Sequence, residues 1–123
     1  MKPQVYIKNA LRTEITKYPF KKTGEVTPRI EHAIDGLVTE AGELMEAIKK
    51  VKFYGAKLDK VNLVEELGDI MWYLAIFSNE LKVSFEEIWY KNIRKLKTRY
   101  PEKYTDKKAQ NRNLKNERKE LEK

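Results

Sequence analysis

The positions of proline and glycine constrain the fold of this 123-residue chain more than any other feature. These residues are sparse, and five of them lie where helices are expected to break: Pro19, Gly24, Pro28, Gly55 and Pro101. Between the breaks, apolar residues recur at the three- and four-residue spacing of an α-helix. No alternating pattern of useful length indicates a strand. The sequence therefore predicts an all-α protein, a bundle of four to five helices.

Two of the predicted helices begin at recognisable capping sequences. Thr27 and Pro28 combine a threonine N-cap with proline at the first helical position. Ser84, with Glu87 three residues later, resembles a capping box. Helices are accordingly expected over residues 4–17, 28–52, 61–82 and 84–100.

The C-terminal quarter differs from the rest in charge and pattern. Residues 91–123 hold 13 of the 26 lysines and arginines against five acidic residues. The segment 105–122 is helix-prone but has almost no apolar stripe. We therefore expect a helical domain over residues 1–104 and a basic helical tail over residues 105–123. Such a tail either contacts phosphates or forms a merely solvated helix, and composition alone leaves both interpretations open.

The absent residues exclude several kinds of chemistry. The chain has no cysteine, so disulfides, thiolate catalysis and thiolate zinc sites are impossible, and its one histidine, His32, cannot build a multi-histidine centre. It has no basic-then-apolar leader and no run of about 18 apolar residues to span a bilayer. We expect a cytoplasmic protein whose chemistry depends on carboxylates, amines and a hard metal ion.

The third predicted helix indicates an oligomer. Its residues 70–77 are all apolar, so apolar side chains surround the helix instead of lining one face. One interpretation is a central core helix in a monomer. We favour a homodimer or homotetramer in which a second face, centred on Trp72 and Ile76, is buried between subunits.

Four acidic residues give the sharpest chemical signal. Glu40 and Glu43 lie three residues apart on the second predicted helix, and Glu66 and Asp69 have the same spacing on the third. This spacing places both acids of each pair on neighbouring turns of one helix face, beside the apolar stripe. If the two helices pack antiparallel, all four carboxylates converge. The alternative is that each pair only solvates its helix.

Such a cluster favours a cation. Close carboxylates repel and raise one another's pKa values, which a bound ion relieves. Oxygen ligands without histidine or cysteine select a hard ion, so Mg²⁺ is expected first and Mn²⁺ next. Gly42 and Gly68, inside the two acid pairs, each cost a helix about 1 kcal/mol relative to alanine. Their matching places predict that the helices approach closely there.

Several motifs together resemble a known family. They are His32-Ala-Ile-Asp-Gly-Leu, Glu40-Ala-Gly-Glu-Leu, Glu65-Glu-Leu-Gly-Asp-Ile-Met-Trp, Asn92-Ile-Arg-Lys-Leu and Arg99-Tyr-Pro. They are similar to those of MazG-type, all-α nucleoside triphosphate pyrophosphohydrolases, over about residues 28–101. The resemblance implies that fold, together with Mg²⁺-dependent cleavage of a (deoxy)nucleoside triphosphate into a monophosphate and pyrophosphate.

The resemblance also implies roles for the acids. Glu40, Glu43, Glu66 and Asp69 would hold Mg²⁺, and sites of this kind are often shared between subunits. Glu43 is our candidate for the catalytic base that accepts a proton from the attacking water.

Further residues are candidates for substrate binding. Asn92, Lys95 and Arg99 share one face of the fourth predicted helix, and the family pattern implies phosphate contacts at the two basic residues. The resemblance implies a nucleotide contact at Tyr73, although a core role is an alternative. His32 lies two turns before Glu40, where it contacts either substrate or only the protein.

A different class of function competes with the enzyme. The chain could be a non-catalytic helical protein that binds nucleotides or nucleic acid through its basic C-terminal segment. Nucleic-acid binding predicts an affinity that falls steeply with salt and needs no Mg²⁺. It leaves the four acids unexplained and would set them against a polyanion, so we expect no nucleic-acid or membrane partner.

Overall fold

The computed structural model describes residues 1–123 and confirms the all-α prediction. It contains six helices and no strand beyond an isolated bridge between Thr23 and Val26. The helices are α1 (Pro3–Leu11), α2 (Pro28–Tyr54), α3 (Lys60–Glu80), α4 (Phe85–Arg99), α5 (Asp106–Gln110) and α6 (Leu114–Glu122). No helix is both long and apolar enough to cross a membrane.

The two predicted helix starts are confirmed. The side chain of Thr27 accepts a hydrogen bond from the backbone N–H of Ile30, and Ser84 accepts one from Glu87. Gly55 ends α2 with a φ of 66°, a left-handed conformation that glycine adopts without strain.

Two predicted helices differ from those observed. The first was expected to reach residue 17 but ends at Leu11, because the backbone and the hydroxyl of Thr13 both donate to the Ala10 carbonyl and form a tight turn there. The tail was expected as one helical segment but forms α5 and α6. Asn113 separates them by capping α6.

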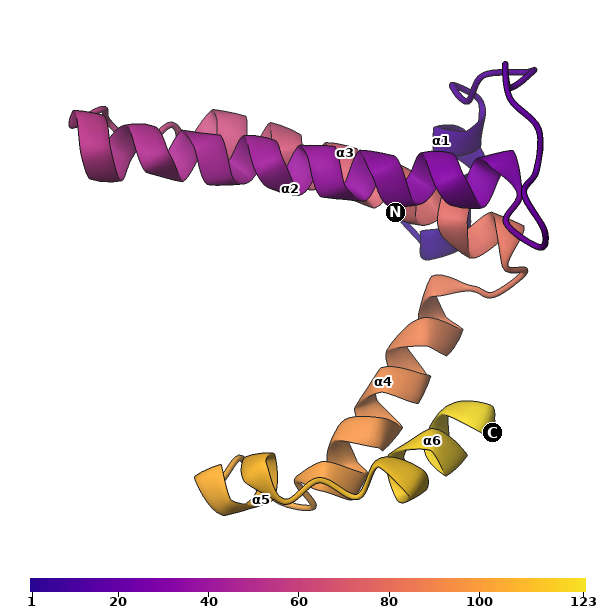
Figure 1. Ribbon diagram of the computed structural model, residues 1–123, viewed down its shortest axis with the longest axis vertical. Coiled ribbons are helices and arrows are strands. Elements are labelled where there is room, and N and C mark those ends of the chain that lie inside the picture. The colour runs from indigo at the N-terminus through magenta and orange to yellow at the C-terminus, as the bar shows by residue number, and fades with distance from the viewer. The chain divides into compact units, whose positions relative to one another are not determined.

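The chain divides into two compact units, Met1–Lys82 and Val83–Lys123. This division does not coincide with the expected boundary after residue 104. In the C-terminal unit, α4 packs against α6 (Figure 1). The predicted tail is therefore part of a helical hairpin with α4.

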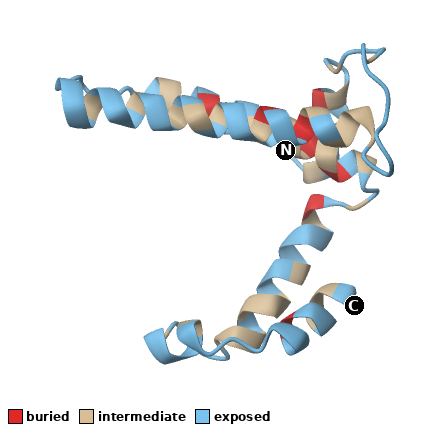
Figure 2. Cartoon of the chain, viewed as in Figure 1, coloured by how far each residue is buried: buried red, intermediate tan, exposed pale blue.

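In the N-terminal unit, α2 and α3 lie side by side along their length, and α1 packs against α3 (Figure 1). Residues early in α2 contact residues late in α3: Arg29 contacts Glu80, and Glu40, further along α2, contacts Glu66, which is earlier in α3. The hairpin is thus antiparallel. The buried apolar residues of this unit gather where α1 joins the hairpin, at Ala10, Ala33, Ala75 and Ile76 (Figure 2).

This core corrects the predicted location of a subunit contact. Ile76 is completely buried within the single chain. The indole Nε1 of Trp72 donates to Thr13 Oγ1 at 2.7 Å and to the Ala10 carbonyl at 3.2 Å. The prediction of a subunit contact on this face is therefore wrong for Ile76, whereas Trp72 is half-buried and hydrogen-bonded at the end of α1.

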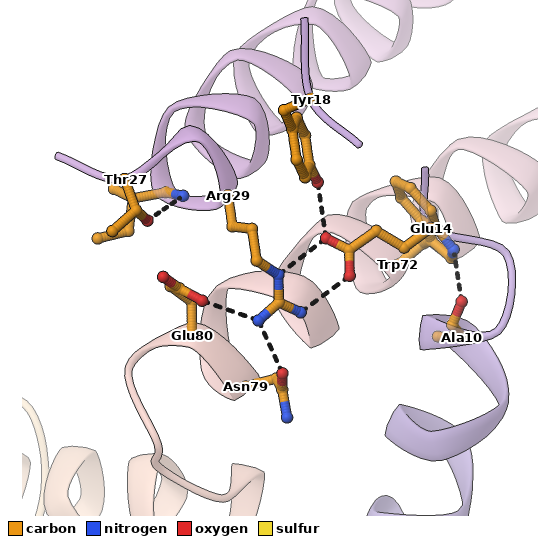
Figure 3. Close-up of polar contacts among 9 residues, drawn as sticks. Ala10, Glu14, Tyr18, Thr27, Arg29, Trp72, Asn79 and Glu80 are labelled. Carbon is orange, nitrogen blue, oxygen red and sulfur yellow. Dashed lines mark hydrogen bonds and ion pairs between the residues drawn. The ribbon is translucent and has the colours of Figure 1, made fainter. Parts of the chain in front are cut away.

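An arginine joins the loop after α1 to both long helices. Arg29 donates through Nε and Nη2 to the carboxylate of Glu14, and through Nη1 to Glu80 and Asn79 (Figure 3). Tyr18 donates to the same Glu14 at 2.6 Å. These bonds fix the end of the hairpin that lies away from the Gly55 turn.

Candidate metal and active site

Three of the four predicted acids meet between α2 and α3. One carboxylate oxygen of Glu40, one of Glu43 and one of Glu66 lie within 4.8 Å of one another. The antiparallel hairpin produces this arrangement, since each helix presents its acids on the face toward the other. Glu66 is buried, with 6% of its surface exposed, whereas Glu43 is exposed and accessible to solvent.

The close carboxylates perturb one another. Burial raises the pKa of Glu40 above its ordinary value, and the adjacent Glu66 carboxylate and the charges of Glu43 and Asp69 add to this. The charge of Glu66 raises the pKa of Glu43, with a smaller contribution from Asp69. Uncompensated negative charge thus concentrates at one point, where a divalent cation would be stabilised.

Asp69 lies at the edge of this cluster. It is exposed and does not belong to the three-oxygen group, although its charge acts on both Glu40 and Glu43. The prediction that all four acids converge is therefore met by three of them in this structure, with Asp69 one turn of α3 away from Glu66.

Asn62 is a polar neighbour that sequence reasoning missed. Its Nδ2 donates to Glu66 Oε1 at 3.0 Å. The amide lies four residues before Glu66, on the same face of α3, so helical spacing was a signal that could have identified it. Its hydrogen bond fixes one oxygen of the buried carboxylate.

A cleft of about 670 Å³ adjoins the acids. The side chains that line it are Glu43, Glu66 and Asn62, three further acids (Glu46, Asp59 and Glu65), and Lys50 of α2. An ammonium group beside a carboxylate cluster is suited to hold a phosphate that also contacts a cation.

Tyr73 and His32 belong to an aromatic cluster one to two turns from the acids. The His32 ring centroid lies 5.4 Å from those of Tyr73 and Tyr18 and 6.1 Å from that of Trp72. Burial raises the pKa of Tyr73, and the charges of Glu40 and Asp69 contribute. Tyr73 thus lies within electrostatic reach of the acids, whereas His32 lies among aromatic rings.

The close approach of the two helices does not occur at the predicted glycines. A methyl group added to Gly42 or Gly68 would meet no atom within 4 Å. At Gly36 it would lie 2.1–2.3 Å from atoms of the Tyr73 ring. The prediction for Gly42 and Gly68 is therefore wrong, because the helices make this contact one turn away from the acids.

The predicted phosphate-binding residues all lie in the C-terminal unit. Arg99 donates through Nε and Nη2 to Glu117, at 2.8 and 3.0 Å, and Arg112 binds the same carboxylate. Lys95 is half-buried on α4, and Asn92 lines an apolar groove beside Leu121. Their spacing along the chain did not indicate that Glu117 would bind Arg99.

The donor set fits a hard divalent cation. Every candidate ligand is a carboxylate oxygen, and an oxygen-only site selects Mg²⁺ or Mn²⁺ over softer metals. Three ligands leave positions for water and phosphate oxygens, as Mg²⁺ sites with phosphate substrates require.

Comparison with known proteins gives a family match. A family model described as the MazG nucleotide pyrophosphohydrolase domain matches residues 29–104, which is more than half of the chain and includes the four predicted acids. The Gene 37 protein of Mycobacterium phage L5 is 37% identical over 68 residues, covering 52% of this chain and 60% of that protein. The match thus spans less than two thirds of that relative. No solved structure matches significantly.

Proposed function

We propose that this chain, which belongs to the MazG nucleotide pyrophosphohydrolase family, hydrolyses (deoxy)nucleoside triphosphates to the monophosphate and pyrophosphate with Mg²⁺. The observation that carries the proposal is the convergence of the Glu40, Glu43 and Glu66 carboxylates from two helices. Glu66 is buried among these acids, so a bound cation would relieve a repulsion that solvent screens poorly there.

Glu40, Glu43 and Glu66 would hold Mg²⁺, with Asp69 as a fourth ligand from the next turn of α3. When bound, Mg²⁺ neutralises phosphate oxygens and acidifies water. Asn62 keeps the Glu66 carboxylate oriented toward the other two acids through its hydrogen bond.

Glu43 is the proposed general base. It is exposed, so a water molecule can reach its carboxylate. A water oxygen attacks phosphorus while its proton passes to Glu43. The bond between the α-phosphorus and the bridging oxygen breaks, and the electron pair leaves on pyrophosphate.

Cationic side chains would stabilise the departing pyrophosphate. Lys50, which lines the cleft beside the acids, is a candidate from the N-terminal unit. Lys95 and Arg99, with Asn92, are the proposed phosphate contacts in the C-terminal unit. Tyr73 and His32 are the proposed nucleoside contacts.

The proposed enzyme is a homodimer or homotetramer. The hairpin of α2 and α3 leaves large apolar side chains exposed, among them Val38, Met45, Val64 and Leu67, each exposed over more than half of its surface. Exposed apolar side chains do not stabilise a monomer, whereas contact with a second copy of the chain would bury them.

The experiment is a panel of nucleoside triphosphates incubated with Mg²⁺, in which pyrophosphate and orthophosphate are measured separately. We expect pyrophosphate release that chelation of the metal abolishes. Glu66→Gln should lower turnover at least about 100-fold, since a ligand is lost at the centre of the cluster. Asp35→Asn, which removes an exposed acid of α2 outside the cluster, is the matched control and should keep full activity.

Other products would contradict the proposal. Orthophosphate without pyrophosphate would indicate a different phosphohydrolase. Nucleic-acid affinity without turnover, falling steeply with salt and independent of Mg²⁺, would support the non-catalytic alternative.

A further inference from the structure

Gly36 of α2 lies directly against the ring of Tyr73 of α3. Gly36 is buried, and a Cβ atom at this position would lie 2.1 Å from Tyr73 Cε1 and 2.2 Å from Cζ. These distances are far below the roughly 3.5–4.0 Å at which carbon atoms attract. Any residue larger than glycine must therefore displace either the ring or a helix.

The Tyr73 ring has little freedom to move aside. Its centroid lies 5.0 Å from that of Trp72 and 5.4 Å from that of His32, both in edge-to-face geometry. Trp72 is in turn held by its two hydrogen bonds to Thr13 and Ala10. The ring is thus confined by the α2 backbone at Gly36 and by the neighbouring rings of Trp72 and His32.

This contact lies one to two helical turns from the proposed ligands. Glu40 follows Gly36 by four residues on α2, and Glu66 precedes Tyr73 by seven residues on α3. These separations correspond to about 6 Å and about 10 Å along a helix. A change in the separation of α2 and α3 at Gly36 would therefore change the separation of the carboxylates.

We propose that the Tyr73 ring, seated on Gly36, is a positioning element that sets the spacing of α2 and α3 at which the carboxylates of Glu40 and Glu66 bind one divalent cation. This inference rests on the metal site of the proposed function. Mg²⁺ requires near-ideal octahedral geometry, with ligands at about 2.0–2.1 Å, so a shift of a few tenths of an ångström in one helix weakens binding.

The test measures Mn²⁺ and Mg²⁺ affinity by calorimetry on the full chain without nucleotide, so that substrate contacts of Tyr73 have no influence. Gly36→Ala should weaken the affinity by about 10–100-fold, the range typical of residues that orient metal ligands. Tyr73→Phe preserves the ring and should keep the wild-type affinity. Tyr73→Leu removes the ring and should lose affinity.

Two further variants separate positioning from general destabilisation. Ile76→Val perturbs the same buried core of α3 without touching Gly36 and should keep the wild-type affinity. The double variant Gly36→Ala with Tyr73→Leu should bind no more weakly than Gly36→Ala alone, because the two residues act through one contact. If Gly36→Ala does not fold, as shown by circular dichroism, Tyr73→Leu against Tyr73→Phe carries the test.

The outcomes distinguish the two proposals. If the wild-type chain binds neither cation, the metal site and this inference both fail. If the wild type binds and a folded Gly36→Ala variant binds equally well, the inference alone is overturned. The inference would also be overturned if the loss of cation affinity in the double variant equalled the product of the losses in the two single variants.

Discussion

At the scale of single residues, the acids of the candidate site have different surroundings. Glu66 is buried and hydrogen-bonded to Asn62, which suits a fixed ligand. Glu43 is exposed, which suits a group that must exchange a proton with water. The two residues are both glutamates, so their different surroundings determine the different roles that we propose for them.

The raised pKa values of Glu40 and Glu43 predict how metal and pH act together. An acid whose pKa is higher in the folded protein than in the unfolded chain destabilises the fold as pH rises through the folded value. A bound cation removes that cost. Mg²⁺ should therefore raise the melting temperature more at pH 7.5 than at pH 5, with a stabilisation of about 2.7 kcal/mol at a concentration 100 times the dissociation constant.

Thermal unfolding with and without Mg²⁺ checks this prediction, with KCl at equal ionic strength as the control. Glu43→Gln should reduce the difference between the two pH values. An equal effect of Mg²⁺ at pH 5 and pH 7.5 would contradict it.

At the scale of elements, ion pairs removed in part from solvent join segments that are distant in the chain. Hydrogen bonds from Arg29 fix the loop after α1 to the start of α2 and the end of α3. In the C-terminal unit, Arg99 and Arg112 bind Glu117, of which only 3% of the surface is exposed. This pairing docks α6, a helix with almost no apolar stripe, onto α4.

The Glu117 contact makes the docking of α6 sensitive to acid. Hydrogen bonds from the two arginines lower the pKa of Glu117 to about 2. Because the folded value lies below the ordinary one, the stabilisation is complete above about pH 4.5 and is lost as pH falls toward 2. Glu117→Gln should therefore accelerate amide hydrogen exchange in α6 at neutral pH on the order of tenfold or more.

Hydrogen exchange followed by mass spectrometry on the full chain measures this effect. Glu122→Gln, which removes an exposed partner of Arg118 on the same helix, is the matched control and should leave the exchange nearly unchanged. Equal protection of α6 in both variants would show that Glu117 does not hold the helix.

At the scale of the whole molecule, the exposed apolar face of α2 and α3 supports assembly. We expect sedimentation to give a dimer or tetramer, and Val64→Glu to shift the chain toward the monomer at micromolar concentration, because a buried unpaired charge is costly. Ile15→Glu, at an exposed apolar residue of the loop after α1, should leave the assembly unchanged. A wild-type monomer at all concentrations would contradict the prediction.

The sequence by itself determined the all-α class, the helix starts at Thr27 and Ser84, and the pairing of acids on two consecutive helices. These depend on local capping and on helical spacing, which short stretches of chain specify. The family resemblance, confirmed by the match over residues 29–104, rests on the same motifs.

Only the tertiary structure decided which residues meet. It placed the close helix contact at Gly36 and not at Gly42 or Gly68, buried Ile76 within the single chain, and bound Arg99 to Glu117. Periodicity assigns a residue to a face of its helix, but the rotation and register of that helix against its neighbour depend on packing across the whole unit. Contacts between residues distant in the chain therefore could not be derived from their spacing.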